Sequence, residues 1–309
     1  MYISKPILKS MEMGKTYPGK EVICMDYEAG GNHFVAGTKG DEILIYDMST
    51  GERKKILHSK KYGVGHIRFF NAAKNAVHSS TKVNHVVRYL SLEENKYISY
   101  FIGHQDSVTG LYTTPSGMLL TSSLDKTLRL WDIKSNASLG IINFAAPVVT
   151  SYDPDSVVFG VGISSTRIAL YDVRSYEKGP FNTLHVKAPG FEADWTHLMF
   201  SPCGKRILLC TNGTGLILLD AFSGKVLSVL RGHKNDHNEP LEATFTNNSE
   251  FVLCGSSDRR IYAWELKNYT ICHSFSGHDT TPRIVQHSLK DINFASADSD
   301  KLALWCPTF

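Results

Sequence analysis

Residues 103–132 read GHQDSVTGLYTTPSGMLLTSSLDKTLRLWD, and this stretch decides the fold. It opens with Gly103-His104, passes through a polar turn around Asp125 and ends with the apolar, aromatic and acidic run Leu128 to Asp132. The pattern is typical of β-strands joined by a tight turn. Partial copies occur before and after it, and recurrence at a fixed period is the sequence signature of a repeat architecture.

An apolar, alternating strand that ends in an aromatic residue and an acid recurs seven times, with substitutions in three copies. The second copy ends in Leu90, the fifth has Leu219 for the aromatic residue, and the seventh ends in Cys306. The marker positions are Tyr46, Tyr89, Trp131, Tyr171, Leu219, Trp264 and Trp305, which gives steps of 43, 42, 40, 48, 45 and 41 residues. This is the WD-repeat period of about 40–45 residues, with four strands to a blade. Because no helical periodicity competes with it, the sequence predicts an all-β, seven-bladed WD40 β-propeller.

We predict a single domain over residues 1–309. The expected blades cover residues 20–58, 62–104, 105–146, 147–187, 190–233, 238–278, and 279–309 plus 1–14. The seventh copy stops directly after its marker strand and lacks an outer strand, whereas residues 5–11, KPILKSM, have an outer-strand pattern. We therefore expect the N-terminal segment to pair into the C-terminal blade, which would close the ring and remove an open strand edge.

Composition excludes several classes of protein. The chain is 42% hydrophobic and 20% charged, as a soluble globular protein is, and its net charge of +3 does not by itself indicate nucleic-acid binding. Its six cysteines form no C-x-x-C pair and no zinc-type spacing with histidines. We find no secretory h-region and no apolar run of membrane-spanning length. We expect reduced cysteines, no cofactor, no metal, no membrane association and no direct nucleic-acid partner.

Three sets of His, Ser, Asp and Trp invite a catalytic interpretation, because Ser, His and Asp form a nucleophilic triad. However, a nucleophile needs one activated copy, and no G-x-S-x-G elbow is present. A relay from Trp through Ser and His to Asp would satisfy every donor and acceptor. We therefore predict structural tetrads and no enzyme activity, with Ser122 and Ser256 as neighbouring alternatives for the hydroxyl. The sets are His104, Ser123, Asp125, Trp131; His233, Ser257, Asp258, Trp264; and His278, Ser296, Asp298, Trp305.

A docking surface is expected where the copies disagree: the loop 59–65, the turn 81–85 and the long loop 188–196. The candidate partner-binding residues are Lys60, Lys61, Tyr62, Arg68, Lys82 and Trp195. Aromatic residues are enriched at interface hot spots, and the basic residues suit a phosphate or an acidic peptide. The alternatives are a solvated surface for the basic residues and inter-blade packing for the aromatic ones. We expect alanine at Tyr62 to weaken partner binding without lowering thermal stability.

Several phrases outside the generic repeat point to one family. They include SKKYGV at 59–64, SLDKT at 123–127, LYDVRS at 170–175 and TNG at 211–213. Together they resemble the eukaryotic nuclear WD-repeat subunit called Swd-two in yeasts. Residues 1–20 depart from the family pattern, and its partner contacts form no short motif that can be transferred.

The resemblance implies a non-catalytic, nuclear scaffold that is monomeric within a larger complex. One home is COMPASS, which methylates lysine four of the third histone. The other is the cleavage and polyadenylation factor with its type-1 protein phosphatase module, which acts in mRNA 3′-end processing and transcription termination. The implied partners are the N-terminal region of the SET-domain methyltransferase and the phosphatase regulatory subunit. The alternative is a generic WD40 adaptor that binds a peptide or RNA in another complex.

Overall fold

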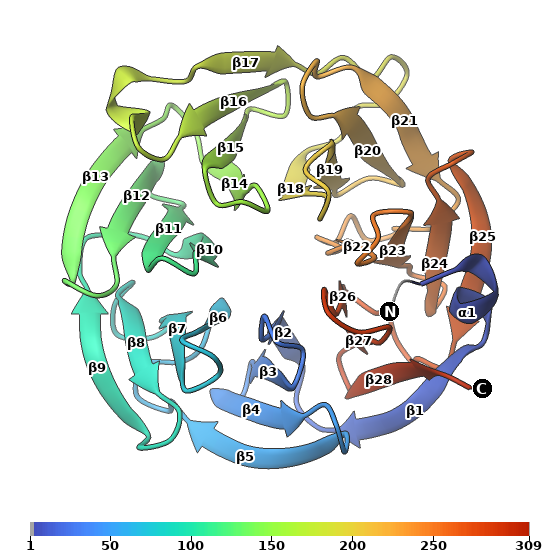
Figure 1. The fold of residues 1–309 in the computed structure, drawn as a ribbon, viewed down its shortest axis with the longest axis horizontal. Coiled ribbons are helices and arrows are strands. Elements are labelled where there is room, and N and C mark those ends of the chain that lie inside the picture. Colours follow the sequence, from blue (N-terminus) through green and yellow to red (C-terminus); the bar gives the residue numbers. More distant parts are fainter. Residues whose placement is uncertain (1–2, 309) are drawn as a thin grey trace. The chain divides into compact units, whose positions relative to one another are not determined.

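The computed structural model describes residues 3–308, which form seven four-stranded antiparallel sheets (Figure 1). In each sheet an apolar inner pair of strands is followed by a more polar outer strand. Strand β20 (Gly215–Asp220) is almost wholly buried, for example, whereas the outer strand β9 (Lys96–Phe101) alternates between exposed and covered positions. The predicted all-β, seven-bladed β-propeller is confirmed.

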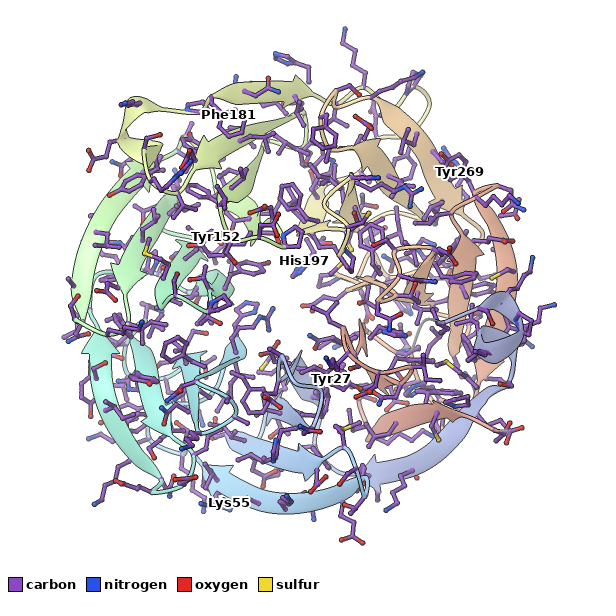
Figure 2. The ribbon with its side chains drawn as sticks, viewed as in Figure 1. Tyr27, Lys55, Tyr152, Phe181, His197 and Tyr269 are labelled. Carbon is purple, nitrogen blue, oxygen red and sulfur yellow. The ribbon has the colours of Figure 1, made fainter. Side chains whose placement is uncertain are left out.

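One compact unit, residues 20–148, holds three of the sheets. Their strands are β2 (Val22–Tyr27), β3 (His33–Thr38), β4 (Glu42–Asp47) and β5 (Glu52–His58); β6 (Ile67–Phe70), β7 (Asn75–Ser79), β8 (Val87–Ser91) and β9; and β10 (Val108–Thr113), β11 (Met118–Ser123), β12 (Thr127–Asp132) and β13 (Ala137–Asn143). Figure 2 labels Lys55 on the outer strand β5. Its ammonium donates to the carbonyls of Leu92 at 2.7 Å and Glu93 at 2.9 Å, which ties the first sheet to the second.

The other unit, residues 1–19 and 149–309, holds the remaining four sheets except Val148, the first residue of β14, and the structure describes its residues 3–19 and 149–308. Their strands are β14 (Val148–Tyr152), β15 (Val158–Ile163), β16 (Arg167–Asp172) and β17 (Asn182–His185); β18 (Trp195–Phe200), β19 (Arg206–Thr211), β20 and β21 (Val226–Arg231); β22 (Thr244–Phe245), β23 (Phe251–Gly255), β24 (Arg260–Glu265) and β25 (Thr270–Ser276); and β26 (Ile284–His287), β27 (Phe294–Ala297), β28 (Lys301–Pro307) and β1 (Met11–Pro18). A short 3-10 helix, η1 (Tyr176–Lys178), lies between β16 and β17. The division of the whole chain into one domain with the blade bounds given above stays a prediction.

The N-terminal segment completes the C-terminal sheet, as expected. Strand β1 pairs antiparallel with β28, from Met11 opposite Pro307 to Pro18 opposite Lys301 (Figure 1). The assignment of residues 5–11 to that strand is wrong, because Lys5–Lys9 form helix α1 and the strand begins at Met11. Pro6 lies in the first turn of α1, where its missing N–H breaks no helical hydrogen bond. The pairing covers the backbone edge of β28 that would otherwise be open.

Helix α1 lies against β25 and anchors the N-terminal segment (Figure 1). Ile3 and Leu8 are buried in a core cluster that includes Phe275 and Trp305. The Lys5 ammonium lies 2.7 Å from the Glu265 carboxylate. No helix among residues 3–308 is long and apolar enough to cross a membrane, and all six cysteines are free thiols.

Candidate functional site

The third sheet contains a buried hydrogen-bond relay that begins at Trp131. The Trp131 indole donates to Thr121 Oγ1 at 3.0 Å, and this hydroxyl lies 2.8 Å from His104 Nε2. His104 Nδ1 lies 2.8 Å from the Asp125 carboxylate. With the imidazole proton on Nδ1, His104 donates to the carboxylate and accepts from the hydroxyl, so every group is satisfied.

The prediction that Ser123 supplies the hydroxyl of this relay is wrong. Ser123 Oγ instead donates to the Asp106 carbonyl at 2.9 Å. The reason is strand register: Leu119 stands opposite Trp131, so the side chain that lies diagonal to the indole on the same face is Thr121, two residues further along. Ser123 lies at the end of the strand, beyond the reach of the indole.

The seventh sheet contains the relay with the residues that we expected. Trp305 Nε1 donates to Ser296 Oγ at 2.7 Å, Ser296 lies 2.6 Å from His278 Nε2, and His278 Nδ1 lies 2.8 Å from Asp298. Burial alone would raise the pKa of Asp298. Hydrogen bonds from His278 and from backbone amides outweigh burial and hold the pKa well below its ordinary range.

The relay predicted in the sixth sheet is absent. Both ring nitrogens of His233 are buried without a hydrogen-bond partner among residues 3–308, and burial lowers the pKa of His233 to about 4. The Trp264 indole donates to the Arg231 carbonyl at 2.9 Å, and Asp258 accepts from the Tyr262 hydroxyl at 2.6 Å. Ser257 Oγ accepts from the Asp236 amide at 3.0 Å.

The register of the sixth sheet explains this absence. Val252 stands opposite Trp264, so Cys254 occupies the position that Thr121 and Ser296 hold in the other two sheets. A thiol is a weak donor and a weak acceptor, and it cannot replace the hydroxyl between an indole and an imidazole. Ser257 follows the end of β23 and cannot reach the indole.

The second sheet is built differently at the same place. The residue equivalent to the tryptophan is Leu90 and not the predicted marker Tyr89, because the β-bulge that precedes Trp131 in the third sheet precedes Leu90 here. Ala76 stands opposite Leu90, so His78, opposite Arg88 on β8, occupies the hydroxyl position. Its Nε2 lies 3.3 Å from the Tyr97 hydroxyl, which also lies 3.0 Å from Ser59 Oγ. Burial lowers the pKa of His78 to about 4, so the ring is neutral at pH 7. This cluster was not predicted from the sequence, although an Arg in the apolar strand β8 and two tyrosines on the neighbouring strand β9 indicate it.

The predicted docking loop 59–65 and turn 81–85 lie together beside this cluster. The Tyr62 carbonyl accepts from the amides of Thr81 at 3.0 Å and Lys82 at 2.9 Å. Lys60 and Lys61 are exposed, and the Lys82 ammonium pairs with the Asp41 carboxylate. These two segments, far apart in the repeat, therefore form one surface of the second sheet.

The two remaining candidate residues are held within the fold. Arg68 donates to the carbonyls of Met25 at 3.1 Å and Ile67 at 2.8 Å, and its guanidinium lies over the Tyr112 ring. Trp195 is only 8% exposed and belongs to a hydrophobic cluster of the fourth and fifth sheets. Neither residue presents a free surface, and their role in partner binding stays a prediction without structural support.

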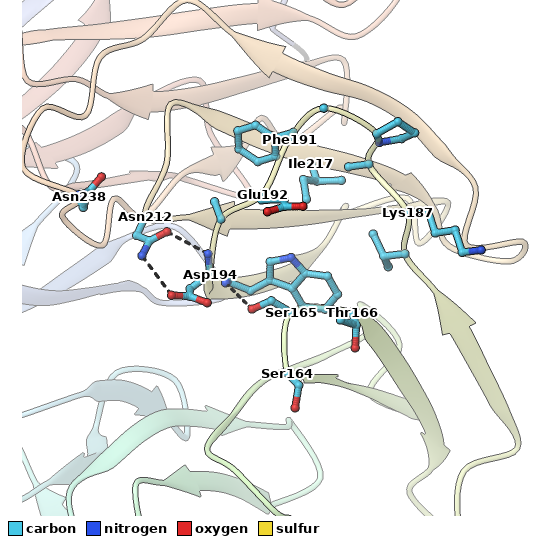
Figure 3. A pocket seen from close by; sticks show the side chains of 16 residues that line it. Ser164, Ser165, Thr166, Lys187, Phe191, Glu192, Asp194, Asn212, Ile217 and Asn238 are labelled. Carbon is cyan, nitrogen blue, oxygen red and sulfur yellow. Dashed lines mark hydrogen bonds between the residues drawn. The ribbon is translucent and has the colours of Figure 1, made fainter.

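The long loop 188–194 borders a cavity of about 740 Å³ (Figure 3). Two of its lining residues, Asp194 and Asn212, are joined by hydrogen bonds: the Asp194 amide donates to Asn212 Oδ1 at 2.9 Å, and Asn212 Nδ2 donates to the Asp194 carboxylate at 3.4 Å. Ser165 Oγ accepts from the Trp195 amide at 3.0 Å. Trp195 forms part of the cavity wall, and the lining is mainly polar.

None of these arrangements resembles a catalytic or metal centre. The described residues, 3–308, include no group of three or more His, Cys, Asp or Glu side chains placed to hold a metal ion. The His–Asp pairs of the third and seventh sheets are nearly inaccessible, with histidine side chains about 1% exposed. The polar groups of the two relays are engaged in hydrogen bonds within their own sheets.

Comparison with known proteins extends this description. The family model described as "WD domain, G-beta repeat" matches residues 95–132 and 224–265. WD repeat-containing protein 82 of Drosophila melanogaster is 38% identical over 306 residues, which cover 98% of this chain and 96% of that protein. COMPASS component SWD2 of Saccharomyces cerevisiae is 30% identical over 318 residues, covering 96% of this chain and 95% of that protein. Set1 complex component swd2 of Schizosaccharomyces pombe is 32% identical over 231 residues, covering 73% and 65%.

Proposed function

Because the chain belongs to the family of WD repeat-containing protein 82 and SWD2, we propose that it is a non-catalytic scaffold subunit of a nuclear complex. The complex is either a COMPASS-type assembly that methylates histone lysine four, or the cleavage and polyadenylation factor with its phosphatase module, or both in turn. The observation that carries this proposal is likeness over nearly the whole chain to a protein named as a COMPASS component.

The geometry supports a scaffold because the apparent catalytic groups are committed to internal hydrogen bonds. In the seventh sheet, the Ser296 hydroxyl lies between an indole and an imidazole and has no access to a substrate. A rigid propeller presents strand edges and loops to peptides of its partners. The proposed partners are the N-terminal region of a SET-domain methyltransferase and the regulatory subunit of a type-1 phosphatase.

Affinity purification of the full chain from nuclear extract, followed by mass spectrometry, tests this proposal. Recovery of methyltransferase subunits supports membership of a COMPASS-type complex, and recovery of polyadenylation factors with phosphatase supports membership of the cleavage and polyadenylation factor. If neither set of proteins is recovered, the proposal is contradicted. The control is a variant in which Ser296 and Trp305 are both replaced, which we expect to unfold because it loses the relay of the seventh sheet. Proteins that are recovered equally with this variant bind misfolded chain and are not specific partners.

A generic adaptor that binds RNA is the second candidate. The exposed Lys60 and Lys61 favour it to a limited extent, since basic side chains neutralise phosphates. Titration of the protein with a single-stranded RNA at rising salt distinguishes the two. RNA affinity that falls steeply with salt would favour the adaptor, because release of counterions drives such binding.

A further inference from the structure

Arg88 is a buried cation without an anion. Its residue is only 2% exposed, and no carboxylate of residues 3–308 forms an ion pair with it. Among the described residues, the guanidinium donates only to neutral groups: the Val86 carbonyl at 3.1 Å, the Asn84 side-chain carbonyl at 3.0 Å and the Ser80 hydroxyl. Its Nε is buried and has no hydrogen-bond partner in this part of the chain. A buried charge is costly unless it is paired, so this arrangement calls for a reason.

Aromatic rings supply part of that reason. The guanidinium carbon lies 3.7 Å from the centre of the Tyr62 ring, and 5.9 and 5.8 Å from those of Tyr97 and Tyr100. Cation–π contact stabilises the charge without neutralising it. Arg88 therefore keeps a positive charge 3.7 Å from the centre of the Tyr62 ring, close enough to attract an anion bound against that ring.

The surface above Tyr62 is itself basic. Lys60 and Lys61 are exposed, and the Lys61 ammonium lies 5.2 Å from the centre of the Tyr62 ring. Neither lysine forms an ion pair within residues 3–308, whereas nearby Lys82 is paired with Asp41. Positive charge thus exceeds negative charge here, although the protein as a whole carries a net charge of only +3.

The neighbouring turn adds an exposed apolar side chain in an unfavourable backbone conformation. Val83 is 76% exposed and has a φ of 69°, which is strained for a β-branched residue. It lies between Lys82, whose amide donates to the Tyr62 carbonyl, and Asn84, which accepts from Arg88. Strain of this kind is often found where a ligand is held. Tyr100 is also partly exposed, at 43%.

We propose that Lys60, Lys61, Tyr62, Val83 and Tyr100, above the buried Arg88, form a docking surface for an acidic segment of a partner protein. Asp and Glu side chains of that segment pair with Lys60 and Lys61, and an adjoining apolar side chain packs on Val83 and the tyrosines. This proposal rests on the proposed scaffold function and names the chemistry of the partner. The commitment to a peptide follows from the combination of cations with exposed apolar and aromatic side chains.

Fluorescence anisotropy with the full chain tests the proposal. The probe is a short fluorescein-labelled peptide of Glu and Asp residues with one central Leu. We expect saturable binding that the double change Lys60→Glu/Lys61→Glu weakens by about tenfold or more, because two attractive charges become repulsive. The matched control is Lys74→Glu/Lys134→Glu, which makes the same change in charge at two exposed lysines of the same unit. Equal weakening by both pairs of changes would show a non-specific charge effect and overturn the proposal.

Two further measurements complete the test. Val83→Gly relieves the positive φ and keeps all charges, so it should preserve folding and weaken peptide binding severalfold. If this variant binds the peptide as tightly as the parent protein does, Val83 does not contact the bound peptide. The second measurement is the affinity of the parent protein for a single-stranded RNA, and tighter binding of the RNA than of the peptide would overturn the proposal.

The same lysine variants in affinity purification separate this proposal from the scaffold function. Partners that are recovered equally with Lys60→Glu/Lys61→Glu would contradict the docking surface and leave the scaffold function standing. Specific peptide binding with no methyltransferase or polyadenylation partners would contradict the scaffold function alone.

Discussion

Cys254 shows how one side chain decides whether a relay forms. It stands where Thr121 and Ser296 stand in their sheets, and its thiol leaves His233 without a hydrogen bond from any residue between 3 and 308. The indole of Trp264 turns to a backbone carbonyl instead. An unsatisfied buried polar group costs about 1–3 kcal/mol of stability, and a hydroxyl at position 254 could recover part of this loss in the sixth sheet.

Replacement of Cys254 by serine should therefore stabilise the protein. We expect Cys254→Ser to raise the free energy of unfolding by about 1 kcal/mol, because the hydroxyl can donate to His233. Urea denaturation measures this change. The matched control is Cys210→Ser, since Cys210 is also fully buried but its sulfur accepts from the Ala243 amide. A similar loss of stability in both variants would contradict the relay as the cause.

The carboxylate of Asp298 predicts an acid-dependent contribution to stability. Its pKa in the folded protein lies below the unfolded value of about 3.9, so the stabilisation is present above that pH and is lost as the pH falls through the folded value. Asp298→Asn should lower the free energy of unfolding by about 2 kcal/mol at pH 7, and the difference from the parent should shrink below about pH 4. Urea denaturation across this range measures it, with the exposed Asp155→Asn as control. A difference that does not depend on pH would contradict a role for the charge.

At the scale of elements, sequence periodicity predicted the strands well and their side-chain pairing poorly. The marker strands β4, β12, β16 and β24 follow from alternation and spacing, because each local pattern repeats. The hydroxyl of each tetrad depends on cross-strand register, and a two-residue difference separates Thr121 from Ser123. Helix α1 was missed because a five-residue segment with two apolar residues fits a strand as well as a helix.

Tyr62 packs on a buried side chain, so the expectation that Tyr62→Ala leaves thermal stability unchanged has to be revised. Tyr62 covers the Arg88 guanidinium at 3.7 Å, so Tyr62→Ala should destabilise the protein by about 2 kcal/mol as well as weaken partner binding. Tyr62→Phe keeps the ring and should change the free energy of unfolding little. Urea denaturation of both variants measures this difference. If Tyr62→Ala unfolds like the parent protein, the stacked ring does not stabilise Arg88.

At the scale of the whole molecule, the repeat predicts the number of sheets but not the side-chain cluster of the second sheet. There His78 and Arg88 stand where the third and seventh sheets have the relay. From the repeat pattern alone, these residues are recognised only as a departure from the sequence of the other blades. The chemistry of the cluster becomes visible when β8, β9 and the two loops are placed together, since their contacts join residues up to about forty positions apart.

Deletions in the N-terminal segment can show whether the chain unfolds as one domain. Deletion of residues 1–10 removes α1 and its buried Leu8, whereas deletion of residues 1–18 also removes β1 and leaves the edge of β28 unpaired. We expect the melting temperature to fall with the first deletion and further with the second, because each removes buried apolar contacts or strand pairing. Scanning calorimetry should show one transition whose calorimetric and van't Hoff enthalpies agree. Two separate transitions would contradict the single-domain prediction, and an unchanged melting temperature after the longer deletion would show that β1 does not stabilise the C-terminal sheet.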